Sequence, residues 1–343
     1  MSHYAKAGVN LKLARGVKAS LPFLLRQASR PEVIGDIGAF GGLFRAQFSS
    51  YRDPVLVASM DGVGTKLRVA VGMRRHDTVG RDLVNHCCND IAVMGADPLF
   101  FLDYIGTGKL EKKVFDGLLT GLARGCAEAG IALLGGETAQ MPGCYAKGDY
   151  DLVGTIIGVV DRKRILDGSR VKPGDVVMGF ASTGLHTNGY SLARQVLFQK
   201  LKLKTSDRPP ELGGASIGEI LLRVHRNYHP LLSRIRKRGI PVHATAHITG
   251  GGFEENIERI LPSQCSVRIR RGTWRIPPIF GLIQKGGKVS ESEMYRVFNM
   301  GIGMVLLAPS RHAAAVIAES VWAGIPAFEV GEVARGKRSV KLI

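Results

Sequence analysis

The sequence predicts an α/β or α+β protein that folds as two domains. Its 343 residues exceed the size at which one hydrophobic core usually keeps growing. Apolar residues make up 45% of the chain and charged residues 22%, which is typical of a globular protein and not of a disordered or fibrous one. The 44 glycines indicate many turns and close backbone approaches.

Cysteine usage and the apolar runs bear on the compartment. Runs such as 301–308 are too short to span a bilayer, and the first six residues lack the apolar core of a secretion signal. The five cysteines form no C-x-x-C pair: Cys87, Cys88, Cys126, Cys144 and Cys265. We expect reduced thiols, a cytoplasmic location and no membrane association.

The formal net charge of +18 raises nucleic-acid binding as a rival function. From residue 200 to the end, Lys and Arg outnumber Asp and Glu by 23 to 11. No zinc-finger pattern, RNA-recognition signature or interleaved aromatic run accompanies the basic clusters at 234–238, 268–271 and 335–338. We therefore expect a basic solvated surface and no specific nucleic-acid recognition.

The first 50 residues are basic and rich in glycine. Residues 4–10 are interpreted as an arm and residues 34–42 as a compact loop. Such a loop could cover a nucleotide or simply connect two elements.

A loop is predicted at 61–66, Asp-Gly-Val-Gly-Thr-Lys, directly after an apolar strand at 54–60. Gly62 and Gly64 let the backbone approach phosphate oxygens, and Thr65 adds a hydroxyl. Lys66 supplies a point charge, and Asp61 can hold a divalent cation. The segment therefore suits an anionic ligand that carries a metal ion, although the same composition fits a plain turn.

The next segments read as helix, strand, helix and strand. Apolar residues at helical spacing predict a helix over 77–94 with Gly95 as its stop, and Asp90 lies beside its buried stripe. A carboxylate there is costly unless it is paired or bound to metal. A strand is expected at 98–105, a helix at 110–130 and a short strand at 131–134. Glu137 is expected in a glycine turn directly after this short strand. A strand at 151–160 and a connection at 161–175 end this half.

The second half begins with a strand at 176–181 and a polar turn at 182–191 that opens a helix over 192–200. A helix N-terminus of this kind is either an anion site or a structural cap. Helical spacing continues over 217–238 with a break at Pro230, and a second phosphate cradle is predicted at 250–252, Gly-Gly-Gly. A strand at 305–308 and a helix at 312–323 follow. Walker and Rossmann fingerprints are absent from the expected strand-to-helix junctions.

Taken together, these motifs resemble the phosphoribosylformylglycinamidine cyclo-ligase (AIR synthase) family. The matching motifs lie in the family's order across nearly the whole chain, at 61–66, 89–90 with 95–104, 135–138 with 141–143, 186–191, 247–252 and 293–299. A selenophosphate synthetase would need a reactive cysteine near its N-terminus, whereas the first cysteine here is Cys87. The amidotransferase of the same superfamily is normally much longer.

The resemblance implies an α+β fold of two domains, each a mixed sheet with packed helices. Residues 1–165 would form an N-terminal domain that binds ATP and makes a homodimer through its sheets, and residues 166–343 a C-terminal domain. The implied reaction is ATP-dependent ring closure of formylglycinamidine ribonucleotide to aminoimidazole ribonucleotide in purine biosynthesis, with release of ADP and phosphate. ATP and Mg²⁺ are the implied cofactors.

The resemblance also assigns the site residues. The expected catalytic group is Asp61, Lys66, Asp90 and His247, and the expected metal ligands are Asp61, Asp90 and Glu137. The expected ATP and phosphate contacts are Gly62, Gly64, Thr65, Lys66, Gly135 and Gly136. The expected substrate contacts are His186, Asn188, Gly250, Gly251, Gly252 and Asn299.

The chain departs from the family pattern mainly at its N-terminus, where Ala5, Lys6, Asn10 and Pro22 replace the usual residues, and later at Met300. These departures concern the contacts of the arm with nucleotide. The alternative function is a basic binding protein that kept the scaffold but lost or weakened the activity. The complete set of carboxylates favours the ligase.

Overall fold

The computed structural model describes residues 28–35 and 40–343, and its described residues form two compact units. The first unit runs up to Ile91 and resumes over Asp97–Arg162, while the second comprises Ala92–Ala96 and Lys163–Ile343. The α+β expectation of two domains is confirmed. The expected arm at 4–10, the departures at Ala5, Lys6, Asn10 and Pro22, and residues 36–39 of the expected compact loop lie outside the described residues.

The first unit is built on a four-stranded sheet in the order β3-β6-β4-β5. Its strands are β3 (Pro54–Gly62), β4 (Asp97–Thr107), β5 (Ala132–Gln140) and β6 (Tyr150–Asp161). β6 pairs antiparallel with β3 and with β4, whereas β4 and β5 are parallel. A two-stranded ribbon, β1 (Val33–Ile34) with β2 (Leu43–Phe44), belongs to the same unit.

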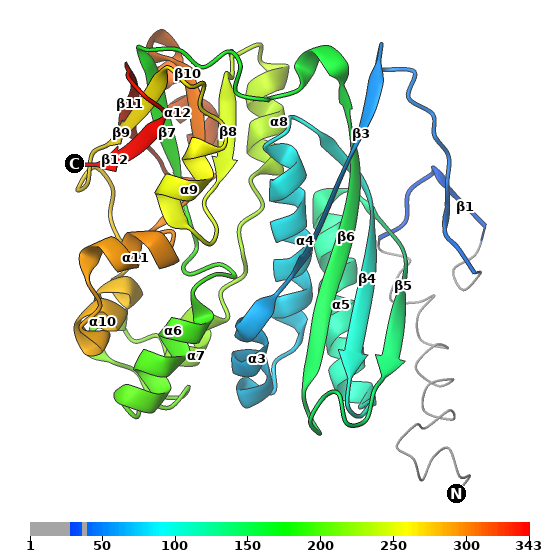
Figure 1. Cartoon of the computed structure of the whole chain (residues 1–343). Helices are drawn as coiled ribbons and strands as arrows, with labels where there is room; N and C mark the ends of the chain where they lie inside the picture. The colour runs from blue at the N-terminus through cyan, green and yellow to red at the C-terminus, as the bar shows by residue number, and fades with distance from the viewer. Residues whose placement is uncertain (1–27, 36–39) are drawn as a thin grey trace, which may run out of the picture. The chain divides into compact units, whose positions relative to one another are not determined.

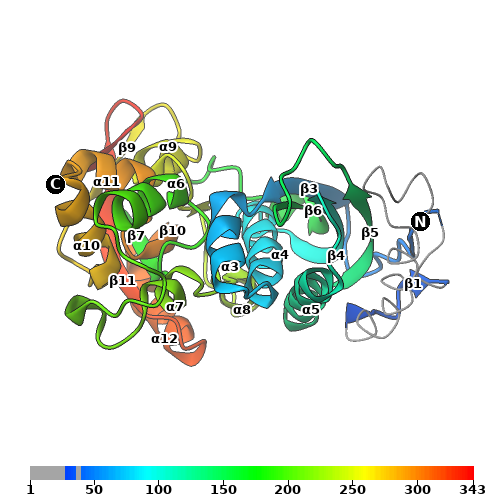
Figure 2. The ribbon, with the colours of Figure 1, turned by 90° about the horizontal axis from the view of Figure 1, so that it is seen from below.

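Helices α4 (Asp77–Ala92) and α5 (Lys112–Ala129) cover one face of this sheet (Figures 1 and 2). A 3-10 turn, η2 (Gly64–Lys66), and helix α3 (Leu67–Met73) precede them. The two long helices approach closely because both carry glycine at the crossing: a Cβ on Gly80 would lie 2.5 Å from the Leu122 nitrogen. Gly130 ends α5 in the left-handed conformation, as expected of a glycine at that position.

The second unit contains a six-stranded mixed sheet in the order β12-β9-β11-β7-β10-β8. Its strands are β7 (Asp175–Ala181), β8 (Ala244–His247), β9 (Cys265–Ile269), β10 (Ile302–Pro309), β11 (Ala327–Arg335) and β12 (Ser339–Leu342). All neighbours are antiparallel except β12 and β9.

Helices α8 (His229–Lys237) and α12 (Ala313–Trp322) pack against this sheet and complete its core. That core joins Phe180 of β7, Leu306 of β10, Ile235 of α8 and Val316 of α12. The other helical segments are α6 (Tyr190–Arg194), its π-helical continuation Gln195–Lys200, α7 (Ile217–Leu221), α9 (Gly252–Glu258), α10 (Pro278–Gly287) and α11 (Glu291–Val297), with short 3-10 turns at 162–164, 210–212 and 310–312.

Most expected elements form close to their predicted bounds. The helical stretch expected over 217–238 is interrupted at 222–228 and not at Pro230, which lies in the first turn of α8. Two glycine segments also differ. The predicted loop at 61–66 is shorter, because β3 includes Asp61 and Gly62. The predicted glycine turn around Glu137 is wrong: Gly135, Gly136 and Glu137 lie inside β5, whose pairing with β4 continues to Gln140. Among the described residues, no helix combines the length and apolarity needed to cross a bilayer.

Candidate active site

In the first unit, two of the expected metal ligands contact the same histidine. Asp61 is at the end of β3, and Asp90 is on the last turn of α4. His86, one turn earlier on α4, places its Nε2 2.9 Å from an Asp61 oxygen and 3.5 Å from an Asp90 oxygen. The helix achieves this because residues four apart share one face. The structure therefore gathers Asp61, His86 and Asp90 into an acidic group.

This group remains open to solvent at its carboxylates. The Asp61 side chain is 40% exposed and that of Asp90 24%, whereas His86 is buried. Burial disfavours the charged imidazole, but the hydrogen bond to Asp61 and the charges of Asp90, Asp61 and Asp82 outweigh it and raise the pKa of His86. The two carboxylates therefore favour the protonated form of His86.

Lys66 is placed differently from the expectation. Its side chain is 0% exposed, and its ammonium lies 2.8 Å from a carboxylate oxygen of Asp82, which is equally buried. Burial lowers the pKa of Lys66, while the charge of Asp82 and the hydrogen bond to it act in the opposite direction. The ammonium thus anchors the turn Gly64–Lys66 to α4 and does not project from it.

Glu137 is not brought to Asp61 and Asp90. Strand β5 is the sheet edge opposite to β3, with β6 and β4 between them. Three strand spacings amount to about 14 Å. Glu137 is exposed, and one of its carboxylate oxygens accepts the Thr138 N–H at 2.6 Å.

Gly136 belongs to a cross-strand row with Asp61. Asp61 pairs with Gly154 of β6, Gly154 with Asp103 of β4, and Asp103 with Gly136 of β5. A Cβ on Gly136 would lie 2.4 Å from an Asp103 oxygen, so the glycine makes room for this carboxylate. Gly135, next to it, has more space, since a Cβ there would meet only a Leu102 methyl at 3.8 Å.

In the second unit, hydrogen bonds join the segments that carry several of the residues expected to contact the substrate. The Asn188 side-chain oxygen accepts the Gly250 N–H at 3.1 Å, which joins the turn before α6 to the glycine segment before α9. Asn256 of α9 fixes that segment, because its amide donates to the carbonyls of Gly250 and Gly252 at 3.2 and 2.7 Å. Gly252 has a positive φ and touches the Tyr295 carbonyl so closely that no side chain would fit.

Asn299 is buried and acts on the backbone. Its amide donates to the Gly184 carbonyl at 2.9 Å, and its oxygen accepts the Gly301 N–H at 2.9 Å. Ser182 also donates to that oxygen, at 3.1 Å. Asn299 thus shapes the polar turn after β7.

His186 and His247 are both buried, and each contacts a third histidine, His225. His186 stands in the polar turn with a positive φ of 61°, an uncommon conformation for a residue with a side chain. Its Nε2 accepts the Thr183 N–H at 3.2 Å. The two histidines that the sequence singled out therefore belong to one cluster.

A pocket of about 820 Å³ lies beside the glycine segment. Gly251 contributes to its wall, together with Glu254, Glu255, Glu258 and Glu293. A Cβ on Gly251 would lie 2.4 Å from a Glu255 carboxylate oxygen. Arg296 also lines the pocket, but the four glutamates outnumber it, so the pocket itself is poorly suited to a phosphate group.

Three residues of these groups were not predicted from the sequence: His86, Asp82 and His225. The signal for the first two was present, since Asp82, His86 and Asp90 are spaced four apart on one helix face. No comparable signal marks His225, which comes to the cluster from the irregular segment between α7 and α8.

The chain matches the family models described as AIR synthase related protein, N-terminal domain, over residues 47–160, and AIR synthase related protein, C-terminal domain, over residues 172–342. It is similar to the phosphoribosylformylglycinamidine cyclo-ligase of Syntrophotalea carbinolica, with 47% identity covering 99% of this chain and 98% of that protein. The protein of the same name from Symbiobacterium thermophilum is 50% identical, covering 96% of this chain and 94% of the relative.

Solved structures agree on the fold. A thiamine-monophosphate kinase from Stenotrophomonas maltophilia has a TM-score of 0.70 at 18% identity, covering 97% of this chain and 96% of that one. The E. coli hydrogenase maturation protein HypE has a TM-score of 0.68 at 19% identity, covering 96% and 93%. A HypE structure in complex with ATP has a TM-score of 0.66 at 16% identity, covering 98% and 93%. On the strength of both domain models and the full-length relatives, the chain belongs to the phosphoribosylformylglycinamidine cyclo-ligase family of AIR synthase related proteins.

Proposed function

We propose that the protein uses ATP to close the imidazole ring of formylglycinamidine ribonucleotide, giving aminoimidazole ribonucleotide, ADP and phosphate in purine biosynthesis. The observation that carries this proposal is likeness over almost the full chain to relatives named for that ligase activity, at up to 50% identity. The open acidic group of Asp61, His86 and Asp90 supports it, because it supplies the ligands that such a reaction needs.

The chemistry explains why carboxylates are required. An amide oxygen is a poor leaving group, so ATP first phosphorylates it, and the amidine nitrogen of the same substrate then displaces the phosphate as the ring closes. Phosphoryl transfer depends on positioning and on neutralising negative charge more than on a protein nucleophile.

Asp61 and Asp90 fit a magnesium ion. Both are carboxylates, which this ion prefers, both are partly exposed, and both reach the same imidazole nitrogen. A bound Mg²⁺ would neutralise charge on the triphosphate. Glu137, at the other sheet edge, is left out of this proposed ligand pair.

The other expected contacts divide into two groups. The backbone of Gly62, Gly64 and Thr65 adjoins Asp61 and is proposed to face the ATP phosphates, while buried Lys66 holds this turn in place. His186, Asn188 and Gly250 are proposed to contact the substrate, and His247 to handle protons. Gly252 and Asn299 act as positioning residues, because their contacts are with the backbone of neighbouring segments.

Two further expectations stay proposals. A homodimer is supported by the first unit's sheet, whose edge strand β3 exposes Leu56 and Met60 on one face. A cytoplasmic location is supported by five cysteines that are all free thiols.

The decisive test is the Asp90→Asn variant. It should reduce substrate-dependent ADP formation to background, because a neutral amide does not hold Mg²⁺ as a carboxylate does. The assay should follow both ADP and the diazotisable aminoimidazole product, with circular dichroism to establish that the fold is intact.

Asp77→Asn is the matched control, since Asp77 is an exposed carboxylate at the other end of the same helix. It should keep wild-type turnover. Near-normal turnover of Asp90→Asn would refute the metal assignment. An inactive wild-type protein that instead binds nucleic acid through its surplus charge, with affinity falling steeply as salt rises, would favour the basic binding protein.

A further inference from the structure

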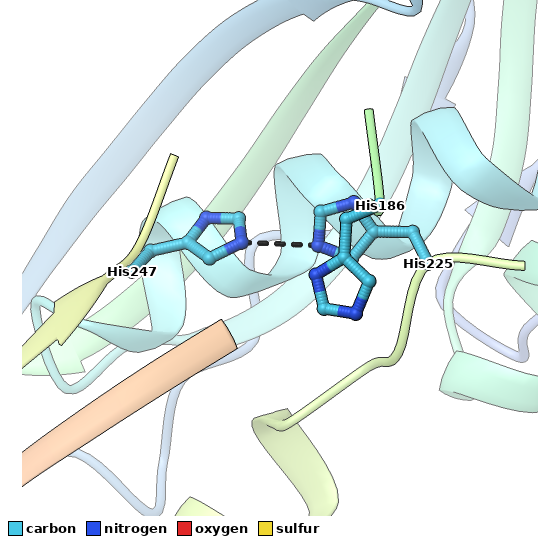
Figure 3. A group of neighbouring side chains, drawn as sticks. All are labelled: His186, His225 and His247. Carbon is cyan, nitrogen blue, oxygen red and sulfur yellow. Dashed lines mark hydrogen bonds between the residues drawn. The ribbon is translucent and has the colours of Figure 1, made fainter. Parts of the chain in front are cut away.

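The second unit buries three histidines in one cluster, His186, His225 and His247 (Figure 3). They come from three separate segments: the turn after β7, the segment between α7 and α8, and the end of β8. Their exposed fractions are 1%, 1% and 5%. Each buried imidazole carries polar nitrogens that lose water, so each needs a hydrogen-bond or metal partner.

Their nitrogens converge. One ring nitrogen from each histidine lies within 4.8 Å of those of the other two. The Nε2 atoms of His225 and His247 are 3.0 Å apart. The rings of His186 and His225 stack at a centroid distance of 4.0 Å and an interplanar angle of 20°.

A single metal ion can serve three adjacent imidazoles at once, because each offers a ring nitrogen as a ligand. The neutral imidazole is the metal-binding form, and nitrogen ligands suit zinc, copper, nickel and cobalt better than magnesium. We propose that His186, His225 and His247 bind a divalent transition-metal ion, with Zn²⁺ the best fit to three histidines and one open position.

The surroundings orient the ligands. Thr187 places its hydroxyl 3.3 Å from His225 Nδ1, so the opposite nitrogen, Nε2, is directed to His247. A partner on the second ring nitrogen is what metal-bound histidines usually have. Gly303 of β10 supplies the space, because a Cβ there would lie 2.5 Å from His186 Cε1 and 2.3 Å from the Tyr228 hydroxyl.

Binding requires a small rearrangement. A tetrahedral zinc ion with bonds of about 2.0–2.1 Å separates its nitrogens by about 3.4 Å, so the His225–His247 pair must open by a few tenths of an ångström and lose the proton that it shares. His186 must turn its ring out of the stack and give up the hydrogen bond from Thr183. Its left-handed backbone conformation stays as it is.

The test uses full-length protein stripped with a chelator and then titrated with Co²⁺ in excess Mg²⁺. Magnesium occupies carboxylate sites, while Co²⁺ reports on the histidine cluster through the strong visible absorption of a four-coordinate ion. Competition with Zn²⁺ should remove that absorption. Wild-type protein is expected to take up one Co²⁺ per chain with this spectrum.

The variant His225→Gln should weaken Co²⁺ binding by more than about 100-fold, because loss of an outer partner alone typically costs 10–100-fold. His225→Cys restores a ligand, and it should bind Co²⁺ with an added thiolate charge-transfer band in the near ultraviolet. His312→Gln is the control, since His312 is in the same unit, in the turn before α12, and outside the cluster.

The outcomes separate metal binding from a purely structural cluster. If wild-type protein shows only weak octahedral absorption, or if His225→Gln binds Co²⁺ as tightly as wild type, the proposal is wrong. If His225→Gln fails to fold, His225→Cys decides: a folded cysteine variant without the charge-transfer band overturns the proposal. The ion would bind in the absence of substrate, because it would take the nitrogens with which His186 is proposed to contact the substrate and His247 to handle protons. The readouts above involve no turnover, so their failure leaves the proposed ligase activity standing.

Discussion

Lys66 illustrates how burial changes the role that a residue type suggests. A lysine after a glycine-containing turn predicts a phosphate contact, but here the ammonium is paired with Asp82 in the interior. Replacing one partner of a buried pair leaves an uncompensated charge, whereas replacing both with apolar residues can be nearly neutral. Substitutions of Lys66 and Asp82 can therefore distinguish a structural anchoring role from nucleotide binding.

We predict that Lys66→Met lowers the free energy of unfolding by about 3–5 kcal/mol and that Lys66→Met with Asp82→Leu recovers most of this loss. Urea denaturation measures both. Arg81→Met is the control, because Arg81 pairs with Glu128 at the surface and should cost about 1 kcal/mol or less. A Lys66→Met protein of wild-type stability that has lost only ATP turnover would show instead that Lys66 serves the nucleotide.

Some residues of the candidate site could be identified from the sequence, and others could not. Asp61 and Asp90 could be chosen from sequence, because carboxylates beside a glycine turn and beside a buried stripe are unusual. Their common partner His86 was detectable from the spacing on α4. His225 was not, since a histidine in an irregular segment carries no periodic signal and its neighbours are set by tertiary packing.

Among the elements, α4 and α5 were predictable from their apolar spacing and a glycine stop, and β4 was predictable from its apolar run. All three match the folded bounds to within a few residues. β5 was not, because two consecutive glycines look like a turn. The glycines are retained inside the strand for space: Gly136 faces Asp103, and the parallel pairing with β4 continues through them. Local turn preference thus gave way to sheet pairing.

Asp103 of β4, which pairs with Gly136 and Gly154, makes the stability of the protein depend on pH. Burial raises the pKa of Asp103 from 3.8 to about 7, although hydrogen bonding to its own backbone opposes this. The folded state then binds more protons than the unfolded state between these two values, so this group makes the protein less stable as pH rises from about 4 to about 7. The full cost is present above pH 7.

We predict that Asp103→Asn removes this cost. At pH 8 the variant should be more stable than wild type by about 1–4 kcal/mol. The upper bound corresponds to the whole pKa shift at about 1.36 kcal/mol per pKa unit. The lower bound allows for the partial exposure of the Asp103 side chain. At pH 4 the two proteins should be equally stable within error. Urea denaturation across this range measures the difference, and a constant difference at every pH would contradict the assignment.

On the scale of the whole molecule, chain length predicted two domains, and the sequence placed their division at 165/166. The second unit also includes a short segment from the first half of the chain, Ala92–Ala96, which begins at the last residue of α4. The Val93 carbonyl accepts the Thr245 hydroxyl at 3.0 Å, and the Met94 carbonyl accepts the Leu166 N–H at 3.1 Å. No local sequence pattern predicts that this segment belongs to the second unit, because its assignment depends on contacts between residues about 70 to 150 positions apart in sequence.

The sheet of the first unit supports the proposed homodimer. One face is covered by α4 and α5 (Figure 2), while the alternating positions of β3 leave Leu56 and Met60 61% and 69% exposed on the other. Ala58, which lies between them on the same face of β3, pairs with Ile157 of β6, and Ile157 continues this face. Exposed apolar side chains on an edge strand would suit a second copy of the chain, since monomers rarely leave such patches in water.

We predict that Met60→Glu converts the protein from a dimer to a monomer of 37.0 kDa in sedimentation or light scattering at micromolar concentration. A carboxylate in the centre of an apolar interface would lose its hydration on association, and in a symmetric dimer two would do so at once. Val321→Glu is the control, because Val321 is an equally exposed apolar residue, at 71%, on α12 of the second unit. It should leave the dimer intact. Dissociation by Val321→Glu with a dimeric Met60→Glu would move the interface from the sheet to α12, and the sheet face would then need another explanation.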